Sequence, residues 1–239
     1  MSPQRSGDRA ADELRPTTIE PGFVATATGS ALISCGGTRV ICTASVQESV
    51  PRWMHGQGRG WLTAEYGMLP ASTGERKQRD ITRGKADGRS IEIQRLIGRS
   101  LRGVVDFAKL GERTVYVDCD VLTADGGTRC ASITGGYVAL ALACKALREA
   151  GKLTASPLTG SVAAVSCGIV GGEPLLDLDY PEDSSAEVDA NVVMTGDGGL
   201  VEVQATAERT PLSRAHLDDL LALAHGGIES LKAIQAAAV

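Results

Sequence analysis

The segment Thr123-Ala-Asp-Gly-Gly-Thr-Arg-Cys130 joins a predicted apolar strand, residues 114–122, to a predicted helix of mostly small residues, 131–149. Paired glycines let backbone N–H groups turn toward a common point, and a helix start adds its unpaired N–H groups and the positive end of its dipole. The Thr128 hydroxyl and the Arg129 guanidinium fall at the same point. The segment therefore predicts a seat for a phosphate-like anion. The alternative is an ordinary turn that carries a surface arginine.

The composition is that of one large domain or of two closely packed halves. Of 239 residues, 43% are hydrophobic but only 3% are aromatic, so the core must be built from Ala, Val, Leu and Ile. No unbroken run of about 18 apolar residues occurs, and the polar residues 1–15 contain no signal-peptide core, so we predict no membrane span. Six cysteines without CxxC spacing are predicted to be buried thiols in a reducing cytoplasm.

Paired glycines also mark tight β-hairpins. Gly36-Gly37 and Gly171-Gly172 each lie between two apolar strands, which is a strong signal for a two-residue hairpin turn. A third hairpin is predicted over 190–205, with its turn at 196–199. The chain is therefore rich in antiparallel strands.

The leading strands of the first two hairpins are alike. Residues 29–36 read Gly-Ser-Ala-Leu-Ile-Ser-Cys-Gly, and residues 160–168 read Gly-Ser-Val-Ala-Ala-Val-Ser-Cys-Gly. We therefore predict an α+β fold of two similar αβ halves, at approximately 10–150 and 151–239, that arose by internal duplication. The halves are expected to pack as a single domain over 1–239.

Apolar residues at helical spacing predict two more helices. One begins near Gly88 to Ser90 and runs to about Ala108, and the other begins near Ser213 as its N-cap. The expected buried stripe of the former consists of Ile93, Leu96, Ile97, Leu101, Val104 and Ala108.

Basic residues are concentrated in one stretch of an otherwise acidic chain. The net charge is −5, but residues 76–102 contain nine basic and three acidic side chains, which gives this window +6 and the remainder −11. Such asymmetry predicts a basic patch that faces a polyanion. The alternative is a solvated face with salt bridges between subunits. The candidate contacts to this polyanion are Arg76, Lys77, Arg79, Arg83, Arg95 and Arg99.

Carboxylates are concentrated farther along the chain, with six in the thirteen residues from Asp177 to Asp189. Asp177 and Asp179 are predicted on one face of a strand that Pro181 ends, and Asp189 opens the next strand. Two carboxylates brought together by this reversal would suit Mg²⁺ or Mn²⁺. The alternative is an acidic surface loop.

A phosphate seat, a basic strip and a pair of metal-binding carboxylates together suit phosphoryl transfer at a nucleic-acid backbone. The sequence contains no Walker-type GxxxxGK[ST] motif, which argues against an ordinary ATPase. Its three histidines, at 55, 216 and 225, form no convincing Ser/His/Asp set and are predicted to be structural or exposed.

The chain resembles the bacterial ribonuclease PH family, phosphate-dependent 3′-to-5′ exoribonucleases that are also called tRNA nucleotidyltransferases. The resemblance extends from about Arg9 to Gln235 and implies the ribosomal-protein-S5-like ribonuclease PH fold. The motifs that carry it are Leu14-Arg-Pro16, Gly56-Gln-Gly58, Gly60-Trp-Leu-Thr-Ala-Glu-Tyr-Gly-Met-Leu-Pro70, Gly88-Arg-Ser-Ile-Glu-Ile-Gln-Arg-Leu-Ile-Gly-Arg99, Asp118 to Arg129, Ala131-Ser-Ile-Thr-Gly135, Tyr180-Pro-Glu-Asp183 and Gly226-Gly-Ile-Glu-Ser230.

The resemblance implies a role for each matching residue. Arg89, Gly127, Thr128 and Arg129 match the phosphate-binding residues, and Asp183 and Asp189 match the catalytic aspartates that hold Mg²⁺ or Mn²⁺. In the implied reaction, inorganic phosphate attacks the last phosphodiester of an RNA 3′ end and releases a nucleoside diphosphate. The reverse reaction adds nucleotides from diphosphates. Asp189 is either a metal ligand or the group that protonates the departing 3′ oxygen.

The resemblance further implies a cytoplasmic homo-hexamer, a trimer of dimers, that trims tRNA precursors and rRNA and has no membrane partner. The stretch from Arg76 to Arg83 would then extend toward single-stranded RNA and contact its backbone. Two other function classes remain open from the sequence. One is a non-catalytic RNA-binding subunit of a related ring, and the other is a phosphorylase that acts on small nucleosides or sugar phosphates.

Overall fold

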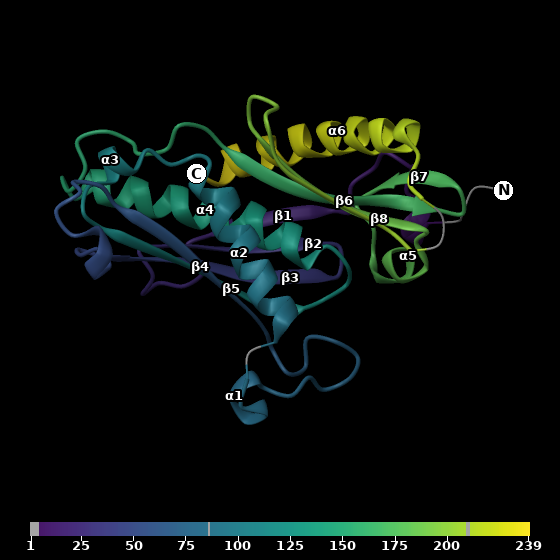
Figure 1. Cartoon of the computed structure of the whole chain (residues 1–239), viewed down its shortest axis with the longest axis horizontal. Helices are drawn as coiled ribbons and strands as arrows, with labels where there is room; N and C mark the ends of the chain where they lie inside the picture. Colours follow the sequence, from purple (N-terminus) through teal and green to yellow (C-terminus); the bar gives the residue numbers. More distant parts are fainter. Residues whose placement is uncertain (1–4, 86, 209–210) are drawn as a thin grey trace.

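Two β-sheets and three long helices account for most of the chain (Figure 1). The computed structural model describes residues 5–85, 87–208 and 211–239, and the side chains of Ile81 and Arg83 also fall outside this description. The first sheet has the order β1-β2-β3-β5-β4, in which only β4 and β5 run parallel. Its strands are β1 (Thr17–Pro21), β2 (Gly29–Cys35), β3 (Thr38–Gln47), β4 (Trp61–Met68) and β5 (Thr114–Thr123).

The second sheet is antiparallel throughout and has the order β7-β6-β8-β9. Its strands are β6 (Val162–Val170), β7 (Glu173–Leu176), β8 (Val188–Thr195) and β9 (Leu200–Ala207). Helix α6 (Arg214–Ala238) packs its apolar stripe against β6 and β7 and begins at Ser213, whose hydroxyl accepts a hydrogen bond from the His216 N–H. In Figure 1 this helix lies along the outside of the second sheet.

Helix α4 (Thr128–Glu149) is the central helix of the molecule. It packs on β2 and β3 of the first sheet and on β6 of the second. Because it is covered on most sides, its own residues are small or apolar nearly all round. Side-chain polar groups tie the halves together at this point. The Thr134 hydroxyl accepts a hydrogen bond from the Ala164 N–H at 3.1 Å, and the Gln235 amide of α6 donates to the carbonyls of Thr134 and Val162 at 3.0 Å each.

By length and composition alone, α4 would be able to cross a membrane. Its most apolar window has a mean hydropathy of 1.5, but 78% of that window is buried inside the structure, which is also what a core helix shows. Length and composition are therefore weak evidence that α4 crosses a membrane. The sequence predicts this helix but does not flag it as a candidate span, because Ser, Thr and Gly interrupt its apolar residues and leave no unbroken apolar run.

Helix α2 (Gly88–Arg102) covers β4 and contacts α4. Shorter elements complete the fold: η1 (Ser6–Asp8), η2 (Arg52–Met54), α1 (Asp80–Arg83), α3 (Phe107–Leu110) and α5 (Tyr180–Ser185). The loop that carries α1 projects away from the two sheets, below the body of the molecule in Figure 1.

The structure confirms the two glycine hairpins, the third hairpin and the buried stripe of α2 from Ile93 to Leu101. The helix predicted to reach Ala108 is too long, because α2 ends at Arg102 and Asp106 caps a separate helix, α3. Ala108 is exposed. All six cysteines are free and buried, as predicted. The two halves form the expected α+β architecture, whereas their origin by duplication remains a prediction.

The carboxylate-rich segment departs from its predicted strand. Strand β7 ends at Leu176, and Asp177 has a φ of 53°. Asp179 then caps α5, in which Pro181 occupies the first turn, a position that suits proline because no N–H is needed there. Glu182 and Asp183 therefore lie on a short helix.

Candidate active site at the junction of the two halves

The glycine turn before α4 is held by Thr38 and Arg15, and Arg15 also links it to the second half. On one side, the Thr38 hydroxyl of β3 donates to the Gly126 carbonyl at 2.6 Å and accepts from the Asp125 N–H at 2.8 Å. On the other side, the Arg15 guanidinium donates to the Asp125 carbonyl and to both carboxylate oxygens of Asp177, at 3.0 and 2.7 Å. The turn is thereby held rigidly where the two halves meet.

Gly126 sets how closely α5 approaches this turn. Its φ is +74°, and a Cβ at this position would lie 2.5 Å from the Leu178 carbonyl oxygen and 2.8 Å from the carbonyl carbon of Asp179. Only glycine allows this contact of backbone on backbone. The Tyr180 N–H adds a hydrogen bond to the Asp125 carboxylate at 3.3 Å. The contact places α5, and with it Asp183, beside the start of α4.

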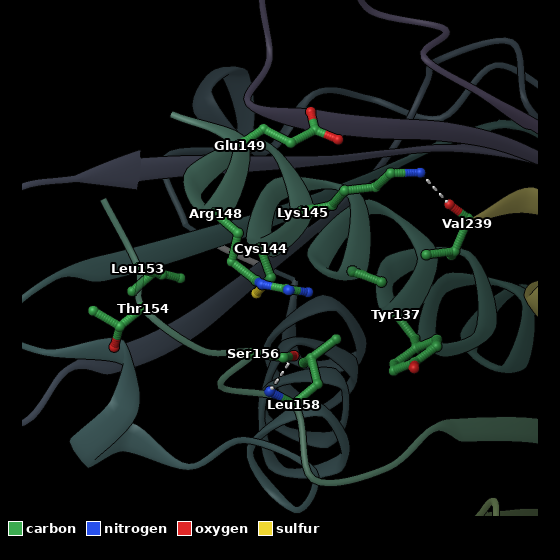
Figure 2. Close-up of a pocket in the computed structure, with 11 residues that line it drawn as sticks. Tyr137, Cys144, Lys145, Arg148, Glu149, Leu153, Thr154, Ser156, Leu158 and Val239 are labelled. Atoms are coloured by element: carbon green, nitrogen blue, oxygen red, sulfur yellow. Dashed lines mark hydrogen bonds between the residues drawn. The ribbon is translucent and has the colours of Figure 1, made fainter. Parts of the chain in front are cut away.

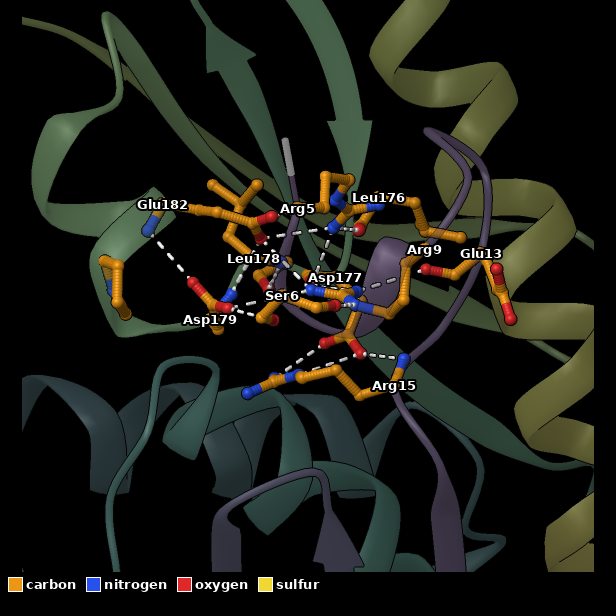
Figure 3. Close-up of polar contacts among 12 residues, drawn as sticks. Arg5, Ser6, Arg9, Glu13, Arg15, Leu176, Asp177, Leu178, Asp179 and Glu182 are labelled. Atoms are coloured by element: carbon orange, nitrogen blue, oxygen red, sulfur yellow. Dashed lines mark hydrogen bonds and ion pairs between the residues drawn. The ribbon is translucent and has the colours of Figure 1, made fainter. Parts of the chain in front are cut away.

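A buried network of charged side chains from the N-terminal segment holds α5 in place (Figure 3). The Arg5 guanidinium donates to both oxygens of Glu182, at 2.8 and 3.1 Å, and to the Leu176 carbonyl at 2.6 Å. Arg9 donates to the same Glu182 carboxylate at 3.2 Å. Glu182 and Asp179 form a capping box, in which each carboxylate accepts from the other residue's backbone N–H at 3.0 Å. Since every charge in this network has a partner, the segment that carries Asp183 is well defined.

A cavity of about 690 Å³ opens between this turn, α2 and α5. Four of the residues predicted to bind phosphate or act in catalysis line it together: Arg89, Gly127, Thr128 and Asp183. The first N–H groups of α4 have no acceptor within the helix, and the glycine turn brings them to this point. The Thr128 hydroxyl is 2.9 Å from the Tyr66 hydroxyl, which is buried. Burial raises the pKa of Tyr66, so this phenol remains a neutral partner.

Asp183 also lines a second hollow of about 490 Å³, together with Asp189 and Glu208. Burial raises the pKa of Asp183, the charge of Asp189 raises it further, and the guanidinium groups of Arg89 and Arg129 oppose the rise. Asp183 is therefore close to Asp189 on one side and to basic residues on the other. Of the predicted site residues, it is the one that both hollows share.

Arg129, which is also predicted to bind phosphate, lies beside this cavity. Its side chain does not line the cavity that Arg89 and Thr128 share. The guanidinium instead donates to the Gln204 side chain at 2.9 Å and lies 3.5 Å from the Glu92 carboxylate. Its charge still acts on Asp183. Arg129 thus borders the predicted phosphate seat but is held by α2 and β9.

The predicted RNA contacts fall into two groups. Arg76 and Arg79 are exposed on the projecting loop, whereas Lys77 is half-buried and paired with Asp87 at 2.9 Å. The Arg83 side chain lies outside the described residues. On α2, Arg95 is exposed, and Arg99 pairs with Glu202 of β9 at 2.5 Å. The structure therefore leaves the loop arginines free to meet a polyanion, while Lys77 and Arg99 already have protein partners.

No group of three or more His, Cys, Asp or Glu side chains in the described ranges is arranged to hold a metal ion. Asp183 and Asp189 supply two carboxylates, and their mutual repulsion is what a cation between them would relieve. Carboxylate oxygens suit Mg²⁺, which commonly uses one or two carboxylates and completes its shell with water and substrate phosphates. The two carboxylates therefore fit a magnesium site in which water and substrate phosphates supply the remaining ligands.

A separate cavity of about 520 Å³ lies beside the C-terminal part of α4 (Figure 2). Tyr137, Cys144 and Arg148 are among the residues that line it, and the Lys145 ammonium there donates to the Val239 carbonyl at 2.7 Å. None of the predicted site residues lines this cavity. The chemistry suggested by the sequence is therefore concentrated at the N-terminal end of α4.

Sequence reasoning gave no separate role to several residues that build the site. Arg15 and Tyr66 lie inside quoted motifs, yet nothing in their spacing indicates that they contact Asp177 and Thr128. Glu208 lies far from the acidic segment in sequence, and only the pairing of β8 with β9 brings it beside Asp189.

Comparison with known proteins gives a consistent result. Residues 13–146 match the 3′ exoribonuclease family, domain 1, and residues 160–227 match domain 2 of the same family. A protein of Roseobacter denitrificans named Ribonuclease PH is 56% identical over 234 residues, which is 98% of this chain and 99% of that relative.

Solved structures share the fold. Rice (Oryza sativa) Rrp46 aligns with a TM-score of 0.79 and 18% identity over 97% of this chain and 98% of its own. The Archaeoglobus fulgidus exosome with RNA bound to the active site aligns with a TM-score of 0.78 and 23% identity, over 96% of this chain and 92% of its own. At such identities the likeness shows the fold alone.

Proposed function

Because the chain belongs to the 3′ exoribonuclease family of the ribonuclease PH type, we infer that it is a phosphorolytic 3′-to-5′ exoribonuclease whose reaction takes place at the junction of its two halves. Inorganic phosphate is the co-substrate, and the products are a nucleoside diphosphate and an RNA shortened by one nucleotide. The observation that carries the assignment of the site is the single cavity lined by Arg89, Gly127, Thr128 and Asp183.

We assign phosphate binding to the end of this cavity where α4 begins. The N–H groups that follow Gly127, the positive end of the α4 dipole and the Arg89 guanidinium all favour an anion. Orthophosphate is already anionic at neutral pH, so it needs no general base, and its main requirement is to be positioned against the RNA. Positioning of this kind can contribute several kcal/mol to a reaction. Arg129 adds charge from its place beside Gln204.

We assign the leaving-group side to Asp183 and Asp189. An oxygen of orthophosphate attacks the last phosphorus of the RNA, and the bond from that phosphorus to the 3′ oxygen of the preceding nucleotide breaks. The 3′ oxygen takes up a proton, from Asp189 or from water, and becomes a hydroxyl. Mg²⁺ or Mn²⁺ held by the two carboxylates would supply a positive charge that stabilises the developing negative charge.

We propose that RNA reaches this site along the projecting loop. Arg76 and Arg79 are exposed there and suit backbone contacts, which carry little sequence information. Precursors of tRNA, and also rRNA, are the proposed substrates. A cytoplasmic homo-hexamer, built as a trimer of dimers, is the proposed assembly, and the six free, buried thiols suit a reducing compartment.

The decisive experiment identifies the product. The purified protein is incubated with a short single-stranded RNA, Mg²⁺ and increasing orthophosphate, and nucleotides are separated by charge. We expect nucleoside diphosphates in proportion to phosphate, and loss of activity in Arg89→Ala and Asp189→Asn. Nucleoside monophosphates, or equal trimming without phosphate, would show a hydrolytic nuclease. Turnover of free nucleosides but not RNA would favour a small-molecule phosphorylase, and no turnover at all would favour a non-catalytic ring subunit.

A further inference from the structure

Tyr180 is the most solvent-exposed large apolar side chain in the described part of the chain, at 63%. Its position is unusual because it also lines the 690 Å³ cavity with Arg89, Thr128 and Asp183. A residue that borders a cavity and is still largely open to solvent lies at the cavity mouth. Tyr180 therefore presents a wide apolar surface within one cavity's width of the proposed phosphate seat.

The backbone of Tyr180 is held firmly. Asp179 before it and Glu182 after it form the capping box, and Pro181 restricts the chain between them. The Tyr180 N–H donates to the Asp125 carboxylate at 3.3 Å. The close backbone contact at Gly126 fixes the distance from α5 to the start of α4. The ring thus projects from a rigid segment, so little order would be lost when a ligand stacks on it.

Nothing in the described structure accounts for exposing this ring. The aromatic pairs found there join Trp53, Trp61 and Phe107, and none includes Tyr180. Its hydroxyl takes part in no hydrogen bond found among the described side chains. The chain has only eight aromatic residues. Leaving one of them exposed beside the site gives up apolar surface that would stabilise the core if it were buried.

We propose that the Tyr180 ring is the platform on which the base of the 3′-terminal nucleotide stacks. The proposal rests on the proposed function, because it takes the RNA 3′ end to occupy the cavity. With the scissile phosphate near Asp183 and the seat at Gly127, the terminal base requires an apolar surface at the mouth, and Tyr180 provides one. Every base has a π-face, so the platform accepts all four and gives positioning without sequence preference.

The test measures binding in phosphate-free buffer, so that no phosphorolysis occurs. A short RNA with an ordinary 3′ nucleotide is compared with one whose 3′ nucleotide is abasic, by fluorescence anisotropy, for the original protein and for Tyr180→Ala, Tyr180→Phe and Tyr180→Trp. Loss of base stacking should raise the Kd for ordinary RNA by roughly tenfold in Tyr180→Ala. The abasic RNA should bind all four proteins equally, and the Phe and Trp variants should retain the preference for the ordinary RNA.

Kinetic data separate this role from a structural one. Tyr180→Ala should raise KM for RNA by about the same factor and leave KM for orthophosphate unchanged. An equal loss on ordinary and abasic RNA, or a failure of Tyr180→Phe to restore binding, would overturn the proposal. A change in assembly mass without any change in the abasic comparison would also overturn it, because Tyr180 would then contact a neighbouring subunit.

The stacking proposal and the proposed phosphorolysis can fail separately. A protein that discriminates between ordinary and abasic ends through Tyr180 but releases no nucleoside diphosphate would refute the proposed function and retain the stacking platform. A protein that releases diphosphates while binding both RNAs equally would retain the function and refute the platform.

Discussion

Replacing Gly126 by alanine tests whether one backbone contact aligns the two sides of the active site. The added Cβ would lie 2.5 Å from the Leu178 carbonyl oxygen and 3.0 Å from the Asp179 Cα. Side-chain Cβ atoms essentially never approach another heavy atom closer than 3.0 Å, so the turn and α5 must separate by at least 0.5 Å. Neither side yields easily, since both contacts are with backbone.

The expected magnitude has two parts. A non-glycine residue at a φ of +74° costs about 1–2 kcal/mol, and overpacking against a fixed backbone costs about 1–3 kcal/mol more. In catalysis, a misplacement of about 1 Å can cost about a hundredfold. A separation of half that size between the seat at Gly127 and Asp183 should lower kcat/KM by roughly tenfold or more.

The chain offers a matched control in Gly172. Its φ is +81°, but a Cβ there would meet nothing within 4 Å, and it lies in the β6–β7 hairpin turn. Gly172→Ala should therefore lose only about 1–2 kcal/mol, which is what a non-glycine residue costs at this φ, and it should keep full phosphorolytic activity. Urea unfolding and phosphate-dependent release of nucleoside diphosphates are measured for both variants. If Gly126→Ala matched Gly172→Ala in kinetics, the idea that this contact aligns the site would be refuted.

Three further predictions concern charge. Arg76→Ala combined with Arg79→Ala should weaken binding of long RNA and flatten its salt dependence while leaving KM for phosphate nearly unchanged; an equal effect on both would contradict the loop assignment. Arg15→Ala should cost about 3–5 kcal/mol in urea unfolding because it leaves the Asp177 carboxylate buried without its partner, and adding Asp177→Asn should recover part of that loss; no recovery would contradict the pairing. Asp118→Asn should raise the free energy of unfolding at neutral pH by a few tenths of a kcal/mol. Burial and neighbouring carboxylates raise the folded-state pKa of Asp118, so its charge costs stability only as pH rises through that pKa, and a gain that persisted below about pH 3 would refute the explanation.

Much of the fold was predictable because local chemistry dictates it. Glycine pairs flanked by apolar strands permit few structures other than hairpins, and Gly36-Gly37 and Gly171-Gly172 both form them. The spacing of Ile93, Leu96 and Leu101 fixed the buried face of α2. The errors lie at boundaries where tertiary contacts compete with local preference. The clearest case is Asp177, whose carboxylate binds Arg15 and which leaves the strand predicted for it.

The site was predicted in its parts but not in its geometry. The motifs predict site roles for Arg89, Thr128 and Asp183, and in the structure these three residues line one cavity. The Arg129 guanidinium, predicted for the same seat, donates to the side chain of Gln204, a residue of β9 that no local pattern connects to it. Sequence also gave no reason to single out Tyr180 beyond its motif, because exposure at a cavity mouth is a property of the folded surface.

The sequence by itself determined the turn before α4, the strands and helices around it, and the chemical types that a phosphorolytic site needs, because these follow from backbone freedom and side-chain periodicity over a few residues. Only the tertiary structure decided that the turn and α5 come within contact distance, since about fifty residues of chain separate Gly126 from Asp179. That approach depends on a glycine that tolerates backbone contact and on buried arginines that neutralise the carboxylates behind it. Such long-range packing is set by shape and charge across the whole molecule and leaves no periodic signal in the chain.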